Sequence, residues 1–142
     1  MDKALYFIAR AVVAFLQALP LRTVARLGRA GGAVFYWLDG RHRRVALANL
    51  TMCFGHEKSA GEIRALAKEN FRRIGENFTC AAKTASMTYE ELKPFVEFNG
   101  PPSIVSPPPG RMPPNILVAI GHFGNFELYA RFGQFCPAIL GG

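Results

Sequence analysis

A run of prolines limits how this chain can fold more than any other feature. Seven of its ten prolines lie between Gly100 and Pro114, in GPPSIVSPPPGRMPP. Because proline lacks a backbone N–H and holds φ near about −65°, this stretch is too rigid and donor-poor for a helix or a central strand. We therefore expect an extended connector over 100–114 between two structured parts. A proline-rich ligand for a binding module is the alternative, although a spacer needs no further assumption.

The first structured part begins with an almost uninterrupted apolar segment. Residues 4–19, ALYFIARAVVAFLQAL, contain Arg10 and Gln17 as their polar residues and stop before Pro20. A helical membrane span needs roughly 17 to 25 apolar residues, and an arginine near its centre costs about 2.5 to 3.5 kcal/mol. Residues 1–20 are therefore predicted to be a membrane anchor, either as a marginal span or as a shallow interfacial helix. A cleaved signal peptide fits less well, because an arginine-rich stretch follows.

Positive charge is concentrated near the N-terminus. Of the net +7, residues 1–50 carry eight Lys/Arg against two acids, and residues 51–142 carry nine against eight. Arg22, Arg26 and Arg29 share one helical face beside apolar side chains, which suits a helix lying on anionic lipid. We predict that these arginines bind the membrane, the alternative being a solvated face of a core helix. Nucleic acid is not expected as a partner, because no aromatic platform or groove-reading motif accompanies them.

The region 21–99 has the patterns of several helices. RHRRVALANLTMCFG predicts a helix that ends near Gly55, and apolar residues recur at three- and four-residue steps between Ile63 and Phe78. That second pattern predicts a long amphipathic helix packed on a core. Two capping boxes mark helix starts: Ser59 with Glu62, and Thr88 with Glu91. Pro94 should stop the short helix that follows, and the FVEF sequence after it could form an edge strand.

The cysteines give no sign of a cross-linked or metal-bound fold. Cys53, Cys80 and Cys136 form an odd number and have no metal-like spacing. A disulfide framework is therefore not expected, and free thiols fit a reducing compartment. We expect no metal site.

The segment 115–142 has the order strand, tight turn, helix. ILVAI, residues 116–120, is apolar throughout and β-branched at three places, as in a strand covered on both faces. Gly121 ends it, and FELYARFGQF then has helical composition. This order predicts an α/β fold, in which ligands bind at the carboxyl ends of the strands.

The turn carries a histidine and a glutamate. His122 can take a proton from a hydroxyl, and Glu127 in the first helical turn can hold the other ring nitrogen. Gly124 permits close backbone approach, and Asn125 is well placed as a helix N-cap. No serine or cysteine adjoins the pair, so direct attack by an acceptor hydroxyl is favoured over a covalent intermediate. Taken alone, the same residues also fit a structural turn.

Two stretches of the chain resemble one known family. GHFGNFEL after an apolar strand, and LPLRTVARLGRAGGAVFYWLDGRHRRVALANLTMCFG upstream, are similar to the bacterial lipid A biosynthesis lauroyl/myristoyl acyltransferases. That family belongs to the lysophospholipid acyltransferase superfamily, whose signature is a histidine followed five residues later by an acid. The resemblance covers essentially the whole chain, and the two matches occur in the right order.

The resemblance implies an enzyme on the cytoplasmic face of the bacterial inner membrane. It would move a fatty acyl group from acyl carrier protein, or from coenzyme A, to a hydroxyl of a lipid A precursor or related glycolipid. No cofactor beyond the acyl donor is implied. His122 would be the general base and Glu127 its partner, with Phe123, Gly124 and Asn125 beside the substrate.

The chain also departs from the family. Members continue past the motif through further strands, whereas this sequence ends at PAILGG, so it looks like an N-terminal half with an incomplete sheet. The connector SPPPGRMPP is also not typical of them. A sibling branch that acylates glycerol phosphate or lysophospholipid shares the base chemistry, but it usually has serine and aspartate where Asn125 and Glu127 stand. The alternative class is a non-enzymatic membrane-associated fragment that binds anionic lipid through its basic helix.

Overall fold

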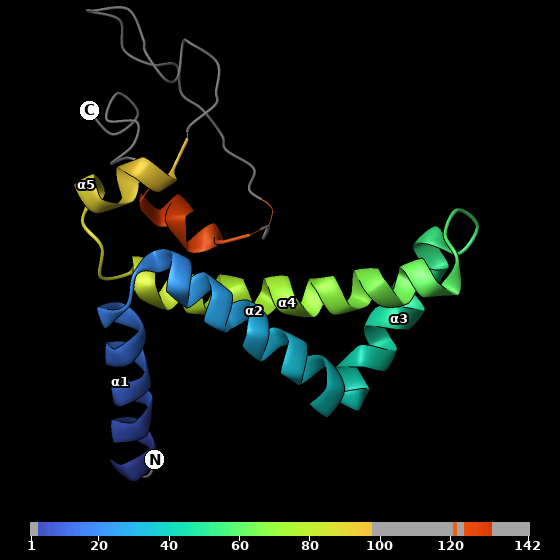
Figure 1. The fold of residues 1–142 in the computed structure, drawn as a ribbon, viewed down its shortest axis with the longest axis horizontal. Coiled ribbons are helices and arrows are strands. Elements are labelled where there is room, and N and C mark those ends of the chain that lie inside the picture. Colours follow the sequence, from blue (N-terminus) through green and yellow to red (C-terminus); the bar gives the residue numbers. More distant parts are fainter. Residues whose placement is uncertain (1–2, 98–120, 122–123, 132–142) are drawn as a thin grey trace, which may run out of the picture. The chain divides into compact units, whose positions relative to one another are not determined.

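The described part of the chain is helical. A computed structural model describes residues 3–97, 121 and 124–131 (Figure 1). The chain divides into two compact units, residues 1–83 and 84–142. The elements in chain order are α1 (Lys3–Ala18), α2 (Leu21–Leu38), α3 (Gly40–Phe54), α4 (Ala60–Thr84), α5 (Tyr89–Leu92) and the 3-10 helices η1 (Lys93–Phe95) and η2 (Phe126–Arg131).

The expected α/β fold is wrong, because no strand occurs in these described ranges. The FVEF sequence, which was predicted to form an edge strand, shows why strands are missing there. Val96 has extended backbone angles, φ −122° and ψ 120°, but no strand among the described residues pairs with it. The predicted strand at 116–120 and the connector at 100–114 lie outside the described residues. The segment after Gly124, predicted to be helical, forms the 3-10 helix η2.

Helix starts in the first two thirds of the chain follow the predicted caps. At the start of α4, the Glu62 amide donates to Ser59 Oγ and the Ser59 amide donates to Glu62 Oε2. The second box, Thr88 with Glu91, is also complete and opens α5. Each box satisfies amides that a helix start leaves without an intrahelical partner. Both predicted capping boxes are confirmed, as are the predicted helices over 4–19 and up to Gly55.

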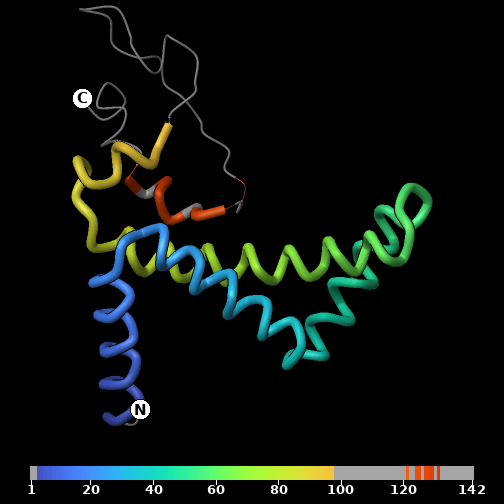
Figure 2. Tube along the Cα trace, in the orientation of Figure 1, coloured from blue at the N-terminus to red at the C-terminus, as the bar shows by residue number. Residues whose placement is uncertain are grey.

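Helices α2 and α4 cross with their backbones in contact (Figure 2). A Cβ at Gly28 would lie 2.6 Å from the carbonyl oxygen of Gly75, and one at Gly32 would overlap the carbonyl of Phe71. Across the same contact, Thr79 Oγ1 donates to the Val24 carbonyl over 3.2 Å. The buried face of α2 therefore consists mainly of small residues.

A small apolar core lies beyond this crossing, where α3 joins α2 and α4. Tyr36, Ala67 and Phe71 are buried in one cluster, and residues of α3 pack against it. The rings of Tyr36 and Phe71 meet edge to face at 5.5 Å, an arrangement worth about 0.5 to 1.5 kcal/mol beyond burial. The predicted apolar stripe of α4 is confirmed at Ile63, Ala67 and Phe71. Leu66, which lies between Ile63 and Ala67, is exposed, as are Ile74 and Phe78 further along.

Helix α1 keeps its apolar side chains on the surface. It has no buried residue, and its large exposed side chains include Leu5, Phe7, Ile8 and Phe15. Its C-terminal turn is joined to α4 by hydrogen bonds, from Gln17 Nε2 to the Ala82 carbonyl and from Lys83 Nζ to the Gln17 carbonyl. Across the described residues, no helix combines the length and the apolar character that a membrane crossing requires.

The glycine crossing leads to a matched pair of substitutions in α2. Gly32→Ala should lower the free energy of unfolding, because overpacking typically costs about 1 to 3 kcal/mol and outweighs a helix-propensity gain of about 1 kcal/mol. Gly31→Ala should raise it by up to about 1 kcal/mol, since a Cβ there meets nothing within 4 Å. Urea unfolding followed by circular dichroism measures both. Equal or greater stability of Gly32→Ala than of Gly31→Ala would contradict the close crossing.

Candidate functional site

The predicted catalytic motif is described in part. Glu127 is exposed on η2, whereas His122 and Phe123 lie outside the described residues. The pairing of His122 with Glu127 therefore stays a prediction. Gly124 has φ +61°, in the left-handed region that favours glycine, and nothing lies within 4 Å of where its Cβ would be. A side chain at this position would strain the backbone, which accounts for the second glycine of GHFGNFEL.

Asn125 ties the motif segment to a buried threonine. Its Nδ2 donates to Thr84 Oγ1 over 3.2 Å, and Thr84 is 4% exposed. The Asn125 carbonyl accepts from the Leu128 amide, so the residue occupies the N-cap position of η2 through its backbone. Its Oδ1 is buried, and none of the described residues donates to it. The side chain thus contacts Thr84, where the sequence predicted a helix cap.

Arg131 fixes the other end of η2 to the same place. Its Nη1 donates to the carbonyl of Thr84 over 3.1 Å and to that of Met87 over 2.7 Å. A cation at the last carbonyls of a helix is favourable, because those groups lack intrahelical partners and carry partial negative charge. The segment that carries Glu127 is therefore held at both ends. Sequence reasoning missed Thr84 and Arg131, because no short motif connects residues more than forty positions apart.

The three arginines predicted to bind lipid have different surroundings. Arg22 and Arg26 are exposed on α2. Arg29 instead bridges to α4, with its Nη2 2.8 Å from Glu69 Oε1 and its Nη1 3.1 Å from Glu76 Oε2. Arg29 is thus held by intramolecular ion pairs, which leaves Arg22 and Arg26 as the exposed members of the predicted stripe.

The Arg29 ion pairs belong to a wider network on α4. Arg73 donates to both Glu69 and Glu76, over 3.0 and 3.1 Å. The hydrogen bond from Arg29 holds the pKa of the Glu69 carboxyl below its ordinary value of 4.5. Because these side chains are partly exposed, solvent screens the pairs and their contribution to stability is modest. The network reinforces the α2–α4 crossing from its rim.

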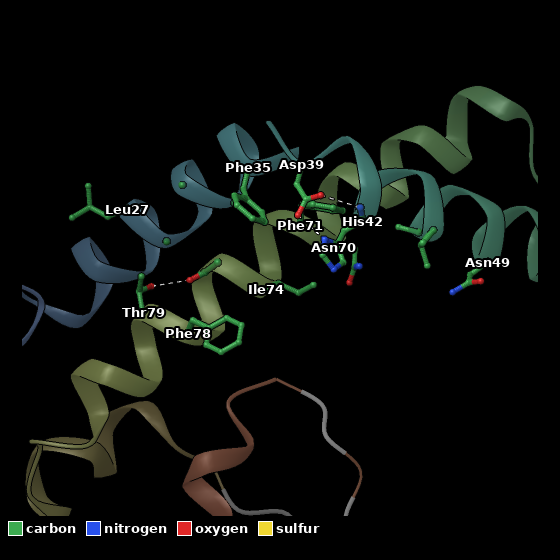
Figure 3. A pocket seen from close by; sticks show the side chains of 16 residues that line it. Leu27, Phe35, Asp39, His42, Asn49, Asn70, Phe71, Ile74, Phe78 and Thr79 are labelled. Atoms are coloured by element: carbon green, nitrogen blue, oxygen red, sulfur yellow. Dashed lines mark hydrogen bonds and ion pairs between the residues drawn. The ribbon is translucent and has the colours of Figure 1, made fainter. Parts of the chain in front are cut away.

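A pocket of about 810 Å³ lies between α2, α3 and α4, within the first unit (Figure 3). Its walls are mostly apolar, and near the junction of α2 and α3 they include Asp39, His42 and Asn70. His42 Nδ1 lies 2.6 Å from Asp39 Oδ2, and the His42 amide donates to Asp39 Oδ1 over 3.0 Å. That amide hydrogen bond is the main reason why the pKa of Asp39 lies below its ordinary value of 3.8.

Sequence reasoning missed this pocket. The signal available was an aspartate three residues before a histidine at a helix junction, which is also the pattern of an ordinary N-cap. Asp39 does cap α3, so the cap alone would not have indicated a cavity.

The described thiols and acids form no metal centre. Cys53 is exposed and Cys80 partly buried, both as free thiols, and burial raises the pKa of Cys80. Among the described residues, no group of three or more His, Cys, Asp or Glu side chains could hold a metal ion.

A comparison with protein families identifies the chain at family level. The model of the family described as bacterial lipid A biosynthesis acyltransferase matches residues 1–136. The chain belongs to this family. The resemblance inferred from GHFGNFEL and from the upstream segment is therefore confirmed.

The family match runs through both compact units and includes the motif segment. No curated protein and no solved structure matches the chain. The match covers nearly all of the chain, so family membership applies to the chain as a whole. The expectation that the sequence is the N-terminal half of a longer enzyme stays a prediction.

The Arg29 network predicts a pH dependence of stability. Because Arg29 lowers the pKa of Glu69 in the folded state, the pair stabilises the fold above pH 4.5, and this contribution is lost as pH falls through the lower folded value. Arg29→Gln should therefore reduce stability at pH 7 and flatten its decline below pH 4.5. Thermal unfolding between pH 7 and pH 3 measures this, with Arg64→Gln on the exposed face of α4 as control. An unchanged slope in Arg29→Gln would refute the coupling.

Proposed function

We propose that this protein is an O-acyltransferase that moves a fatty acyl group from acyl carrier protein, or from coenzyme A, to a hydroxyl of a lipid A precursor or related glycolipid. The observation that carries the proposal is the family match over residues 1–136, with GHFGNFE inside it. Membership of the family supports acyl transfer as the class of reaction. The donor, the acceptor and the catalytic residues are our proposal.

The chemistry needs one base and one supporting acid. His122 takes the proton of the acceptor hydroxyl while the hydroxyl oxygen attacks the thioester carbonyl. The C–S bond then breaks, the thiolate leaves with the electron pair, and the imidazolium returns the proton to it. Glu127 stabilises the imidazolium and keeps the imidazole in the tautomer that can accept a proton.

The residues between this pair suit contact with a substrate. Gly124 has open space at its Cβ position, so a substrate can approach its backbone closely. Phe123 and Asn125 flank it in the sequence, and we propose that the three residues border the acyl-transfer site. The hydrogen bonds of Asn125 and Arg131 with Thr84 and Met87 support this role, because they limit the movement of η2 and so of Glu127.

Substitution of the proposed base tests the reaction. In the full-length protein, His122→Ala should lower the rate of acyl transfer by ~10²–10⁴-fold, which is what general-base catalysis typically contributes. Glu127→Gln should give a smaller loss, and Glu97→Gln, an exposed acid in the same unit, should have no effect. Transfer of a radiolabelled acyl group from acyl carrier protein to a lipid acceptor is the measurement, with circular dichroism to confirm folding. Near-normal transfer by His122→Ala would rule out the assignment.

A second role, association with a lipid surface, has its own support. Helix α1 exposes apolar side chains and has no buried residue, and Arg22 and Arg26 are exposed on the helix that follows. Apolar side chains entering the acyl boundary, together with arginines at the phosphates, bind a helix to anionic membranes. We propose that residues 3–26 hold the protein on the cytoplasmic face of the inner membrane. This role holds for an enzyme and for a non-enzymatic membrane protein alike.

Flotation with vesicles tests the lipid surface. Basic residues near an anionic membrane contribute about 1 kcal/mol each, so Arg22→Glu with Arg26→Glu should weaken binding by about tenfold or more. The matched control is Arg64→Glu with Lys68→Glu, which makes the same charge change on exposed positions of α4. Binding of the first variant should fall in vesicles with anionic lipid and change little in neutral ones. Equal losses in the two variants would show that only net charge matters.

A further inference from the structure

The pocket between α2, α3 and α4 lies entirely within residues 1–83, and none of its lining comes from the motif segment. Its volume of about 810 Å³ falls in the range of sites that enclose small molecules, roughly 300 to 1,000 Å³. Along α2 its lining runs from Leu27 to Phe35, about 12 Å at the rise of an α-helix, and it continues to Asp39 just after that helix. The pocket is therefore long enough for an extended chain.

Large apolar side chains line this pocket and remain exposed. Leu27, Phe35 and Ile74 are about half exposed, at 45%, 54% and 44%, and Phe78 is 76% exposed. Ile74 and Phe78 belong to the apolar stripe of α4 that the sequence predicted to be buried. A contiguous apolar surface of this kind on a folded unit marks a binding site more often than chance exposure does.

Gly31 is the glycine of α2 that the helix crossing does not explain. Gly28 and Gly32 are required because their Cβ atoms would overlap α4. A Cβ at Gly31 would meet nothing within 4 Å, and this residue lines the pocket. Glycine inside a helix is disfavoured by roughly 1 kcal/mol relative to alanine, so this position gives up stability without a packing reason. Because Gly31 has no side chain, the pocket wall is open at this position.

The charges of the lining fit an uncharged occupant with a polar end. The ionisable side chains among the lining residues are Asp39 and His42, and they are paired with each other. The other lining side chains carry no charge. Beside this pair, Asn70 adds an amide (Figure 3). An alkyl chain attached to a hydrogen-bonding group complements both parts.

We propose that this pocket binds one fatty acyl chain of a membrane lipid, with the polar end of that chain at Asp39 and His42. The choice of a lipid rests on the proposed acyltransferase function and on the exposed apolar helix α1 of the same unit. A flat bilayer surface cannot fill a concave pocket, whereas one chain drawn out of the bilayer can. The lining of the pocket includes none of the proposed catalytic residues.

Photocrosslinking tests the pocket without requiring turnover. The full chain is mixed with vesicles that contain a phospholipid with a diazirine on one acyl chain, irradiated, and digested for mass spectrometry. Crosslinks are expected at Phe35, Ile74 and Phe78. Gly31→Leu should remove most of them, because its side chain fills the pocket from a position with free space. Ala30→Leu, an exposed neighbour outside the lining, is the matched control and should keep them.

Each further outcome decides against the proposal or separates it from the proposed function. Crosslinks confined to α1, or undiminished in Gly31→Leu, overturn it. So does a concentration-dependent dimer in which a second copy protects Phe35 and Phe78 from labelling. Thermal unfolding of Gly31→Leu checks that the fold is kept. If His122→Ala retains acyl transfer while the pocket is labelled, the proposed catalytic role fails and the lipid site stands. If His122→Ala loses acyl transfer and the pocket is not labelled, the catalytic role stands and the lipid site fails.

Discussion

The backbone contact between α2 and α4 is the constraint on which the rest of the first unit depends. Gly28 and Gly32 of one helix and Gly75 of the other remove every side chain from the point of closest approach. Close contact lets Thr79 reach a backbone carbonyl of α2 and brings Arg29 within ion-pair distance of two glutamates. It also directs the large side chains of both helices away from the crossing. Some of them form the Tyr36 and Phe71 core, and others line the open pocket.

Local signals in the sequence identified the helices well. The capping boxes at Ser59 and Thr88 specified helix starts because each depends on residues three positions apart. Pro20 separates α1 from α2 for a similarly local reason. The apolar pattern of α4 correctly predicted burial at Ile63, Ala67 and Phe71, where α4 faces the core. It was wrong at Ile74 and Phe78, because periodicity indicates a shared face and not whether another element covers it.

The parts that sequence reasoning could not reach depend on distant partners. In α2 no local pattern indicated that Gly28 and Gly32 would form much of the buried face. No residue near Arg29 in the sequence predicts its ion pairs with Glu69 and Glu76. The same holds for the link between Asn125 and Thr84, which are 41 positions apart. The family could be recognised from GHFGNFEL because that motif is contiguous, whereas the α/β fold inferred from the segment before it did not hold for the described residues.

The short connections between the first four helices have a consequence for how the protein is made. Two residues join α1 to α2, one joins α2 to α3 and five join α3 to α4. Short connections need little loop-closure entropy, but the α2–α4 contacts join residues 40 to 55 positions apart, so the crossing forms only after most of α4 has been made. All residues of the α2–α4 crossing have been synthesised once Thr79 has been added to the chain. We expect this unit to fold on the ribosome while the motif segment is still inside the exit tunnel, so that the two units complete their folding one after the other.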